Sequence, residues 1–158
     1  MQTNKEIIEK FYTAFSKLDY ENMQSCYSEN VVFNDPVFGL LNATETFAMW
    51  EMLCKKATSF SLKFSNIELL DHEYATCQWQ ATYIYSATGN KVVNNIKAHM
   101  RIKDGKIIEH SDAFSLYKWA QMALGIKGWL IGWNSFVQHK IKVGAKKSLL
   151  KFMNSNND

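Results

Sequence analysis

In the first sixty residues, apolar side chains recur every three or four positions, which is the spacing of amphipathic helices. Thr3-Asn4-Lys5-Glu6 has the form of a capping box, so we expect a first helix to begin after Thr3. Asp19 is expected to cap a short second helix that carries Tyr27, and Asn42 is expected to cap a third helix that ends near Thr58. The other apolar positions of these segments are Ile7, Ile8, Phe11, Tyr12, Phe15, Leu18, Met23, Cys26, Phe47, Met49, Trp50, Leu53 and Cys54.

From residue 60 onward the apolar period becomes two, which predicts β-strands. An earlier apolar run, Val31-Val32-Phe33, predicts one further strand, followed by a loop from Gly39 to Asn42. Helices followed by an antiparallel meander indicate an α+β fold in which a curved sheet wraps over the helices. The alternating segments are residues 60–64, 76–85, 92–102 and 106–115, with turns at Thr88-Gly89-Asn90 and Lys103-Asp104-Gly105-Lys106.

Residues 116–153 return to a helical pattern, with expected interruptions at Gly125, Gly128, Gly132 and Gly144. The segment from Gly128 to Trp133 is the most apolar stretch of the chain, and lysines follow it. We therefore expect one domain over residues 1–115 and a basic amphipathic helical extension over residues 116–158.

The composition is that of a globular protein, with 47% hydrophobic and 14% aromatic residues. The formal net charge of +3 is unevenly distributed, because residues 1–115 carry −3 and residues 116–158 carry +6. Cys26, Cys54 and Cys77 lie in apolar patterns, which favours buried thiols over a zinc site or disulfides. Since the N-terminus has no apolar signal core and no apolar run approaches the length of a membrane span, a cytoplasmic location is expected.

Asp35 is the first candidate for chemistry, because it follows the Val31-Val32-Phe33 run and precedes the only proline of the chain. Proline disfavours a helical conformation at the residue before it, so Asp35 is expected to be extended at the end of a strand. Among apolar neighbours, a carboxylate loses water and becomes a better proton acceptor. The alternative is an aspartate that only starts a turn, because Asp-Pro is common in turns.

With this order of elements, the chain resembles the nuclear transport factor 2-like superfamily, which includes ketosteroid isomerase and the SnoaL-like polyketide cyclases. The resemblance covers roughly residues 4–115. It implies a cone-shaped, curved antiparallel sheet packed on N-terminal helices, an apolar pocket and a homodimer. The segments that carry it are the first helix leading into Asp19-Tyr20-Glu21-Asn22, residues 32–39, and the closing hairpin at residues 104–110.

The resemblance also implies roles for individual residues. Asp35 matches the general base of the ketosteroid isomerases, whereas the positions of their two oxyanion donors hold Phe11 and Ala98 here. Asp112 resembles the acid/base carboxylate on the last strand of SnoaL-like cyclases, and His110 lies beside it. The implied activity is isomerisation or cyclisation of a hydrophobic carbonyl compound. The alternative is a non-catalytic small-molecule-binding module, or a dimeric scaffold, of the same fold.

His110 and Asp112 are two residues apart on one predicted strand, so both side chains point to the same side. They are a plausible proton-transfer pair, or a buried polar pair whose groups satisfy each other. His99 and Arg101 alternate to the opposite face and are not expected in the site. Histidines and carboxylates show no metal-ligand spacing, and no glycine-rich phosphate loop is present, so no metal or cofactor is expected.

The expected ligand is flat and mostly apolar, because aromatic residues recur at inward positions, although most such residues are simply core. The helical extension has three candidate roles: a lid over the cone, a dimer surface, or a weak contact with an anionic membrane surface. Nucleic-acid binding is not expected, since the lysines lack arginines and interleaved aromatic residues. The expected pocket residues are Phe15, Phe38, Trp50, Trp79, Tyr83, Ala98, Met100 and Phe114, and the lid residues are Trp119, Met122, Trp129 and Trp133.

Overall fold

A computed structural model of the chain describes residues 1–156. Three helices lie in the N-terminal part of the chain, and the third of them follows the first two strands. These are α1 (Asn4–Ser16), α2 (Tyr20–Ser25) and α3 (Ala43–Lys56). The capping boxes predicted at Thr3 and Asn42 both form, with each cap side chain accepting a hydrogen bond from the backbone N–H three residues later. Local sequence therefore determined where α1 and α3 begin.

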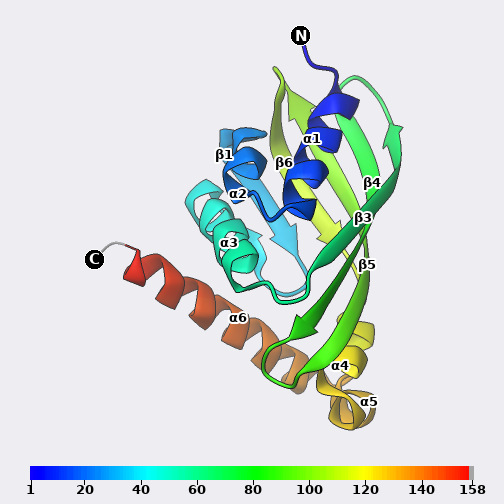
Figure 1. Ribbon diagram of the computed structural model, residues 1–158, viewed down its shortest axis with the longest axis vertical. Coiled ribbons are helices and arrows are strands. Elements are labelled where there is room, and N and C mark those ends of the chain that lie inside the picture. The colour runs from blue at the N-terminus through cyan, green and yellow to red at the C-terminus, as the bar shows by residue number, and fades with distance from the viewer. Residues whose placement is uncertain (157–158) are drawn as a thin grey trace.

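Six strands form one curved sheet, in the spatial order β2-β1-β6-β5-β4-β3. The helices α1 to α3 lie against one face of this sheet, which we call the inner face (Figure 1). The α+β class predicted from the sequence is thereby confirmed. The strands are β1 (Tyr27–Asp35), β2 (Gly39–Leu41), β3 (Ser61–Leu69), β4 (Tyr74–Tyr85), β5 (Asn90–Lys103) and β6 (Lys106–Ala113).

The sheet is mixed and not wholly antiparallel as predicted, because β1 runs parallel to β6. All other neighbouring strands are antiparallel. Alternation within a strand defines its two faces but does not identify its neighbour. The pairing of β1 with β6 joins segments far apart in the sequence, so only the tertiary structure could show its direction.

Two local predictions near β1 are also corrected. Residues 39–41 form the short strand β2 and not a loop, because Gly39 has a φ of 70° and turns the chain back antiparallel onto Asp35. Tyr27 begins β1 and does not end the second helix, which stops at Ser25. Tyr27 pairs with Ile107 of β6, and this long-range contact overrides the local helical pattern.

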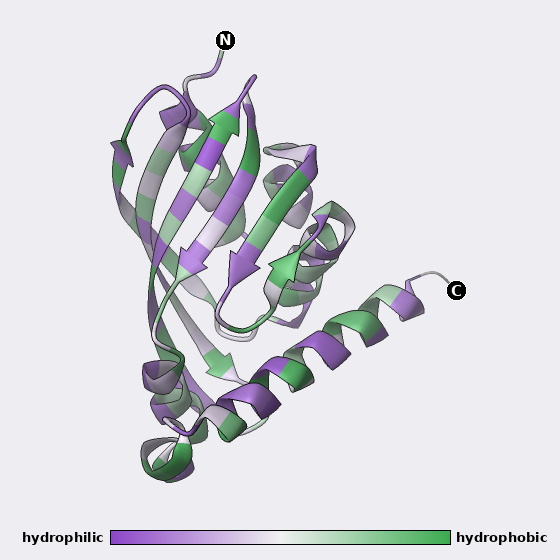
Figure 2. Cartoon of the chain, turned by 180° about the vertical axis from the view of Figure 1, so that it is seen from behind, coloured by the Kyte–Doolittle hydropathy of each residue, from purple (hydrophilic) through white to green (hydrophobic). Residues whose placement is uncertain are grey.

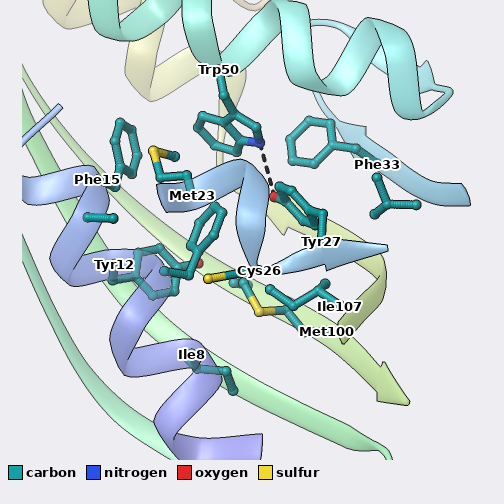
Figure 3. Packing of buried hydrophobic residues seen from close by; sticks show 14 of the residues in the cluster. Ile8, Tyr12, Phe15, Met23, Cys26, Tyr27, Phe33, Trp50, Met100 and Ile107 are labelled. Carbon is teal, nitrogen blue, oxygen red and sulfur yellow. Dashed lines mark hydrogen bonds between the residues drawn. The ribbon is translucent and has the colours of Figure 1, made fainter. Parts of the chain in front are cut away.

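The main core lies between the inner face and the three N-terminal helices. Figure 3 shows Trp50 of α3 directed toward Tyr27, with Ile8 and Tyr12 of α1 among the buried side chains of this core. The rings of Phe11 and Trp50 lie edge to face with their centroids 5.7 Å apart. On β5, the alternating residues from Val92 to Ile102 are buried as the sequence predicted.

The helical extension consists of α4 (Leu116–Leu124), α5 (Ile126–Ile131) and α6 (Ser135–Ser155). Helix α4 packs on the start of β5 in a second cluster that contains Val92 and Trp119. From there α6 runs back beside α3 (Figure 1), and its Leu149 is buried in the main core. Contrary to the prediction, Gly128 lies within α5 and Gly144 lies within α6, and neither interrupts its helix. None of the helices within residues 1–156 has the length and hydropathy that crossing a membrane would require.

Candidate active site

The parallel pairing of β1 and β6 brings three sequence-predicted site residues onto the inner face. Phe33 of β1 lies opposite His110 of β6, and both side chains are buried. Two residues further along each strand, on the same face, are Asp35 and Asp112. Asp35, His110 and Asp112 therefore belong to one group of neighbouring side chains.

His110 is hydrogen-bonded through both ring nitrogens. Its Nδ1 lies 2.7 Å from the Tyr27 hydroxyl, and its Nε2 lies 3.0 Å from Asp112 Oδ1. The Trp50 indole N–H donates to the same Tyr27 hydroxyl over 3.0 Å. One arrangement of protons satisfies this chain: Tyr27 donates to Nδ1, and the Nε2–H donates to the carboxylate of Asp112. The imidazole is thus fixed in orientation and tautomer.

Asp112 is only 6% exposed, yet its two carboxylate oxygens differ in their contacts. Oδ1 accepts from His110 and, over 3.3 Å, from the Trp79 indole N–H. Within the described residues, Oδ2 has no protein hydrogen bond. One oxygen thus orients the group, and the other retains free lone pairs for a ligand or a proton.

Asp35 is the last residue of β1, where its Oδ1 accepts the backbone N–H groups of Val37 and Phe38. The turn interpretation of Asp-Pro is therefore confirmed, and the carboxylate is also desolvated. Burial, together with the negative charge of Asp112, raises the pKa of Asp35 from 3.8 to about 6 in spite of these hydrogen bonds. A carboxylate with this pKa is suited to exchanging protons near neutral pH.

Tyr12 is a member of this group that the sequence analysis assigned only to the core. Its side chain is fully buried, and its hydroxyl is the one buried side-chain polar atom among residues 1–156 without a hydrogen-bond partner. Burial, and after it the charge of Asp112, raises the pKa of Tyr12 well above its ordinary value. Unpaired hydroxyl groups are rare in protein interiors, so Tyr12 carries a donor that the described part of the chain leaves unused.

Tyr27 was likewise missed, because its partners are distant in the sequence and its own position suggested the end of a helix. Its hydroxyl connects β1, β6 and α3 through His110 and Trp50. A buried tyrosine or tryptophan usually has a hydrogen-bond partner, so either residue in a core segment indicates that a polar group lies next to it in the fold. The sequence alone does not say which partner each of them finds.

The residues predicted to line a pocket lie on the inner side of the sheet or against it. Ala98 pairs with Asp112 and Met100 with His110 across β5 and β6. Phe15 and Trp50 lie edge to face with their centroids 5.1 Å apart. Phe38, Trp79, Ala98 and Met100 are buried, whereas Tyr83 and Phe114 are half-buried near the contact with α4.

The lid residues separate into two kinds. Trp119 is buried and donates its indole N–H to the Tyr83 hydroxyl over 2.8 Å. Trp129 and Trp133 are 63% and 64% exposed, so they do not fill the cone. The predicted lid thus reduces to α4, which covers the Tyr83 end of the sheet.

The opposite, outer face carries His99 and Arg101, as alternation predicted. Arg101 forms ion pairs with Glu73 and Glu109 at 2.6 and 3.1 Å. Two surface hollows of about 400 and 700 Å³ lie on this outer side, and neither includes Asp35 or Asp112. Because Asp112 is so little exposed, a substrate reaches it only if side chains at the rim move.

Within the described residues, no group of three or more histidine, cysteine or acidic side chains could hold a metal ion.

Comparison with solved structures supports the fold. The chain is similar to a candidate polyketide cyclase from Pseudomonas putida KT2440, with a TM-score of 0.65 and 18% identity over 78% of this chain and 99% of that one. It is also similar to a protein with a ketosteroid isomerase-like fold from Catenulispora acidiphila DSM 44928, with a TM-score of 0.66 and 10% identity over 77% and 94% of the two chains.

A third similar structure is AclR, a candidate hydroxylase from Streptomyces galilaeus, with a TM-score of 0.63 and 16% identity over 80% of this chain and 96% of that one. At such identities the likeness concerns the fold alone. No curated protein matches the chain.

The family comparison agrees with the order of elements. The SnoaL-like domain model matches residues 8–110, which extend from α1 to the histidine of β6. This match covers more than half of the 158 residues and includes Asp35 and His110. The chain belongs to the SnoaL-like domain family, within the nuclear transport factor 2-like fold.

Proposed function

We propose that this protein is an acid/base enzyme that isomerises or cyclises a flat, hydrophobic carbonyl compound on the inner face of its sheet. The observation that carries the proposal is the group formed by Asp35, Asp112 and Tyr12. Two carboxylates lie on one desolvated face, and the only unpartnered buried hydroxyl among the described residues belongs to the same group. A carboxylic acid with a raised pKa, such as Asp35, together with an unsatisfied donor is typical of sites where protons move.

In the proposed reaction, the Asp35 carboxylate takes a proton from the carbon beside the carbonyl group. The C–H electron pair moves into a carbon–carbon double bond, and the carbonyl electrons move to oxygen, which becomes an enolate. The Tyr12 hydroxyl donates a hydrogen bond to that oxygen, a stabilisation that would replace the donors absent at Phe11 and Ala98. In a substrate with a second double bond conjugated to this enolate, Asp35 then returns the proton to the far end of the conjugated system, which shifts the double bond and completes an isomerisation. In a cyclisation, the enolate carbon instead forms a bond to the carbon of a second carbonyl group, and the resulting alkoxide oxygen takes back the proton that Asp35 holds.

His110 and Asp112 supply the second proton-handling unit of the proposal. His110 is held between Tyr27 and Asp112, so its imidazole can stabilise the charge that Asp112 carries. The negative charge of Asp112 also contributes to the raised pKa of Asp35. Asp112 is therefore proposed to tune the base and, through Oδ2, to accept a hydrogen bond or a proton from the substrate.

Exchange of carbon-bound hydrogen for deuterium tests this proposal without knowledge of the natural substrate. The protein is incubated with 2-tetralone, a flat aromatic ketone, in D₂O, and loss of the C1 proton signal is followed by NMR. The wild-type chain should accelerate exchange, with a rate that rises as pH passes through about 6. The Asp35→Asn and Asp112→Asn variants should lower the acceleration by about 100-fold or more. Glu29→Gln, which alters an exposed carboxylate on the same strand as Asp35, is the matched control.

A non-catalytic binding module is the second candidate, favoured by the fact that His110 and Asp112 Oδ1 are already satisfied by core side chains. That interpretation predicts quenching of tryptophan fluorescence by bound 2-tetralone, with hydrogen exchange at the rate of buffer alone. Binding without exchange would therefore replace the enzyme proposal. If neither binding nor exchange is observed, flat aromatic ketones are excluded as the ligand class.

A further inference from the structure

The end of the molecule opposite the N-terminus carries an exposed apolar surface made by α5 and the start of α6 (Figures 1 and 2). We call it the α5 patch. Its side chains are between 46% and 79% exposed, and three of them are aromatic. A cluster of this kind on one surface marks an interaction site, because scattered apolar side chains are normal but contiguous ones are not. The members are Ile126, Trp129, Leu130, Ile131, Trp133 and Phe136.

The α5 patch is anchored by close packing on α4 and by side-chain hydrogen bonds, although it is exposed. Gly128 of α5 packs so closely on α4 that a Cβ atom there would lie 1.9 Å from the carbonyl oxygen of Ala120. The Tyr117 hydroxyl donates to the carbonyl oxygen of Trp129 over 3.1 Å, and the Trp133 indole N–H donates to that of Leu130 over 2.9 Å. The apolar side chains are therefore presented on a preformed surface.

The outward side of α6 continues the α5 patch with alternating apolar and basic residues. Phe136, Lys140, Val143, Lys147 and Leu150 are spaced by three or four residues, so they lie on one side of the helix, and all five are exposed. The Lys140 ammonium lies 4.8 Å from the centre of the Phe136 ring. The opposite side of α6 packs on the body through Leu149 and its neighbours.

The charge of this region has a single sign. Residues 116–156 contain seven lysines and no aspartate or glutamate. A second copy of the chain seated on the α5 patch would bring two such lysine-rich segments together, which like-charge repulsion opposes. A partner surface that is both apolar and negatively charged offers favourable contacts to the tryptophans and to the lysines. Such a surface is that of a bilayer with anionic lipids, where indole rings lie at headgroup depth and lysines reach the phosphates.

We propose that the α5 patch and the outward side of α6 attach this protein peripherally to anionic membranes. The apolar side chains of the α5 patch enter the boundary between headgroups and acyl chains, while Lys140 and Lys147 contact the phosphates. This attachment would hold the SnoaL-like domain at a membrane surface, where hydrophobic compounds concentrate. The proposal rests on the α5 patch and on the lysines of residues 116–156, and it does not depend on the proposed chemistry of Asp35.

Vesicle flotation with the full chain tests the proposal. The probes are vesicles of phosphatidylcholine alone and of phosphatidylcholine with phosphatidylglycerol, at low and at physiological salt. The wild-type chain should float with the anionic vesicles, and less so as salt rises. Lys140→Gln and Lys147→Gln should each lower the partition coefficient about fivefold. Trp129→Ser combined with Trp133→Ser should lower it about tenfold or more, and unchanged circular dichroism would show that the fold persists.

Matched controls come from outside the helical extension. Leu70→Ser and Lys97→Gln change exposed residues that do not belong to the α5 patch or to α6, and they should leave flotation unchanged. Absence of wild-type flotation on anionic vesicles would overturn the proposal, and so would flotation that survives the tryptophan and lysine substitutions. Self-association that is lost in Trp129→Ser, without any vesicle binding, would instead identify the α5 patch as a contact between copies of the chain.

Discussion

At the scale of single residues, the main core contains two buried tyrosines with opposite hydrogen-bond status. The Tyr27 hydroxyl accepts from Trp50 and bonds to His110. The Tyr12 hydroxyl has no partner among the described residues. Removing each hydroxyl group in turn therefore distinguishes a hydroxyl with a structural role, that of Tyr27, from an unpaired one, that of Tyr12.

Tyr27→Phe should destabilise the fold by about 3 kcal/mol, because it leaves both the Trp50 N–H and the His110 ring buried without their partner. Tyr12→Phe should change the free energy of unfolding by about 1 kcal/mol or less, and in the stabilising direction, since no hydrogen bond is lost. Urea denaturation of both variants measures the difference. Equal losses of stability would show that the Tyr12 hydroxyl is satisfied in solution.

Asp35 should make the stability of the protein depend on pH. Its folded pKa of about 6 exceeds the ordinary value of 3.8, so the folded state holds the proton more tightly than the unfolded state. The associated stability is fully present below pH 3.8 and is lost as pH rises through about 6, an effect of up to about 3 kcal/mol.

The Asp35→Asn substitution should remove this part of the pH dependence. An asparagine side chain cannot ionise, but it keeps an oxygen that can accept from the N–H groups of Val37 and Phe38. Urea midpoints of both chains between pH 4 and 7.5 provide the measurement. The two curves should lie close together near pH 4, separate as pH rises from about 4 to about 6, and keep a constant difference above that, with the variant the more stable. Parallel curves would place the pKa of Asp35 near its ordinary value.

At the scale of elements, two glycines of the helical extension have opposite surroundings. Gly128 lies against the backbone of α4, where no side chain fits. Gly144 lies within α6, and a Cβ atom there would meet nothing within 4 Å. The first glycine permits the close packing of two helices, whereas the second only lowers the helix propensity of α6.

Gly128→Ala should destabilise the α4–α5 contact by about 2 kcal/mol or more, because the clash is with backbone and cannot be relieved by a side-chain rotation. Gly144→Ala should stabilise α6 by about 0.5–1 kcal/mol. Thermal unfolding followed by circular dichroism compares the two substitutions. If Gly128→Ala leaves the melting temperature unchanged, α5 does not pack on α4 as described.

At the scale of the whole molecule, the extension returns to the body through α6. Leu149 is 3% exposed and lies in the main core, whereas its neighbour Leu150 is 54% exposed. This contact predicts that residues 116–156 and the preceding domain unfold together, even though the family model ends at residue 110.

Leu149→Ala should lower the free energy of unfolding by about 2–4 kcal/mol, the usual cost of emptying a core leucine site. Leu150→Ala, the matched control, should change it by about 0.5 kcal/mol or less. Urea denaturation and native-state hydrogen exchange are measured together. A loss of protection confined to α6, with an unchanged denaturation midpoint, would show that α6 docks as a separate unit.

The local pattern determined a large part of this protein. Thr3 and Asn42 begin helices where their capping boxes predicted, and alternation on β5 separated its buried residues from His99 and Arg101. Cap hydrogen bonds span three residues and strand faces alternate with period two, so short stretches of sequence contain this information. The same spacing placed His110 and Asp112 on one side of β6.

Only the tertiary structure decided which distant residues meet. The parallel pairing of β1 with β6 brings Asp35 toward Asp112, and the Tyr27 hydroxyl finds its partner 83 residues away. It also left Trp129 and Trp133 exposed while Trp119 became buried, although all three lie in apolar stretches. The sequence by itself determined the elements and the faces of each strand, because those depend on near neighbours. The proton-handling group and the exposed α5 patch depend on long-range packing, which no local pattern encodes.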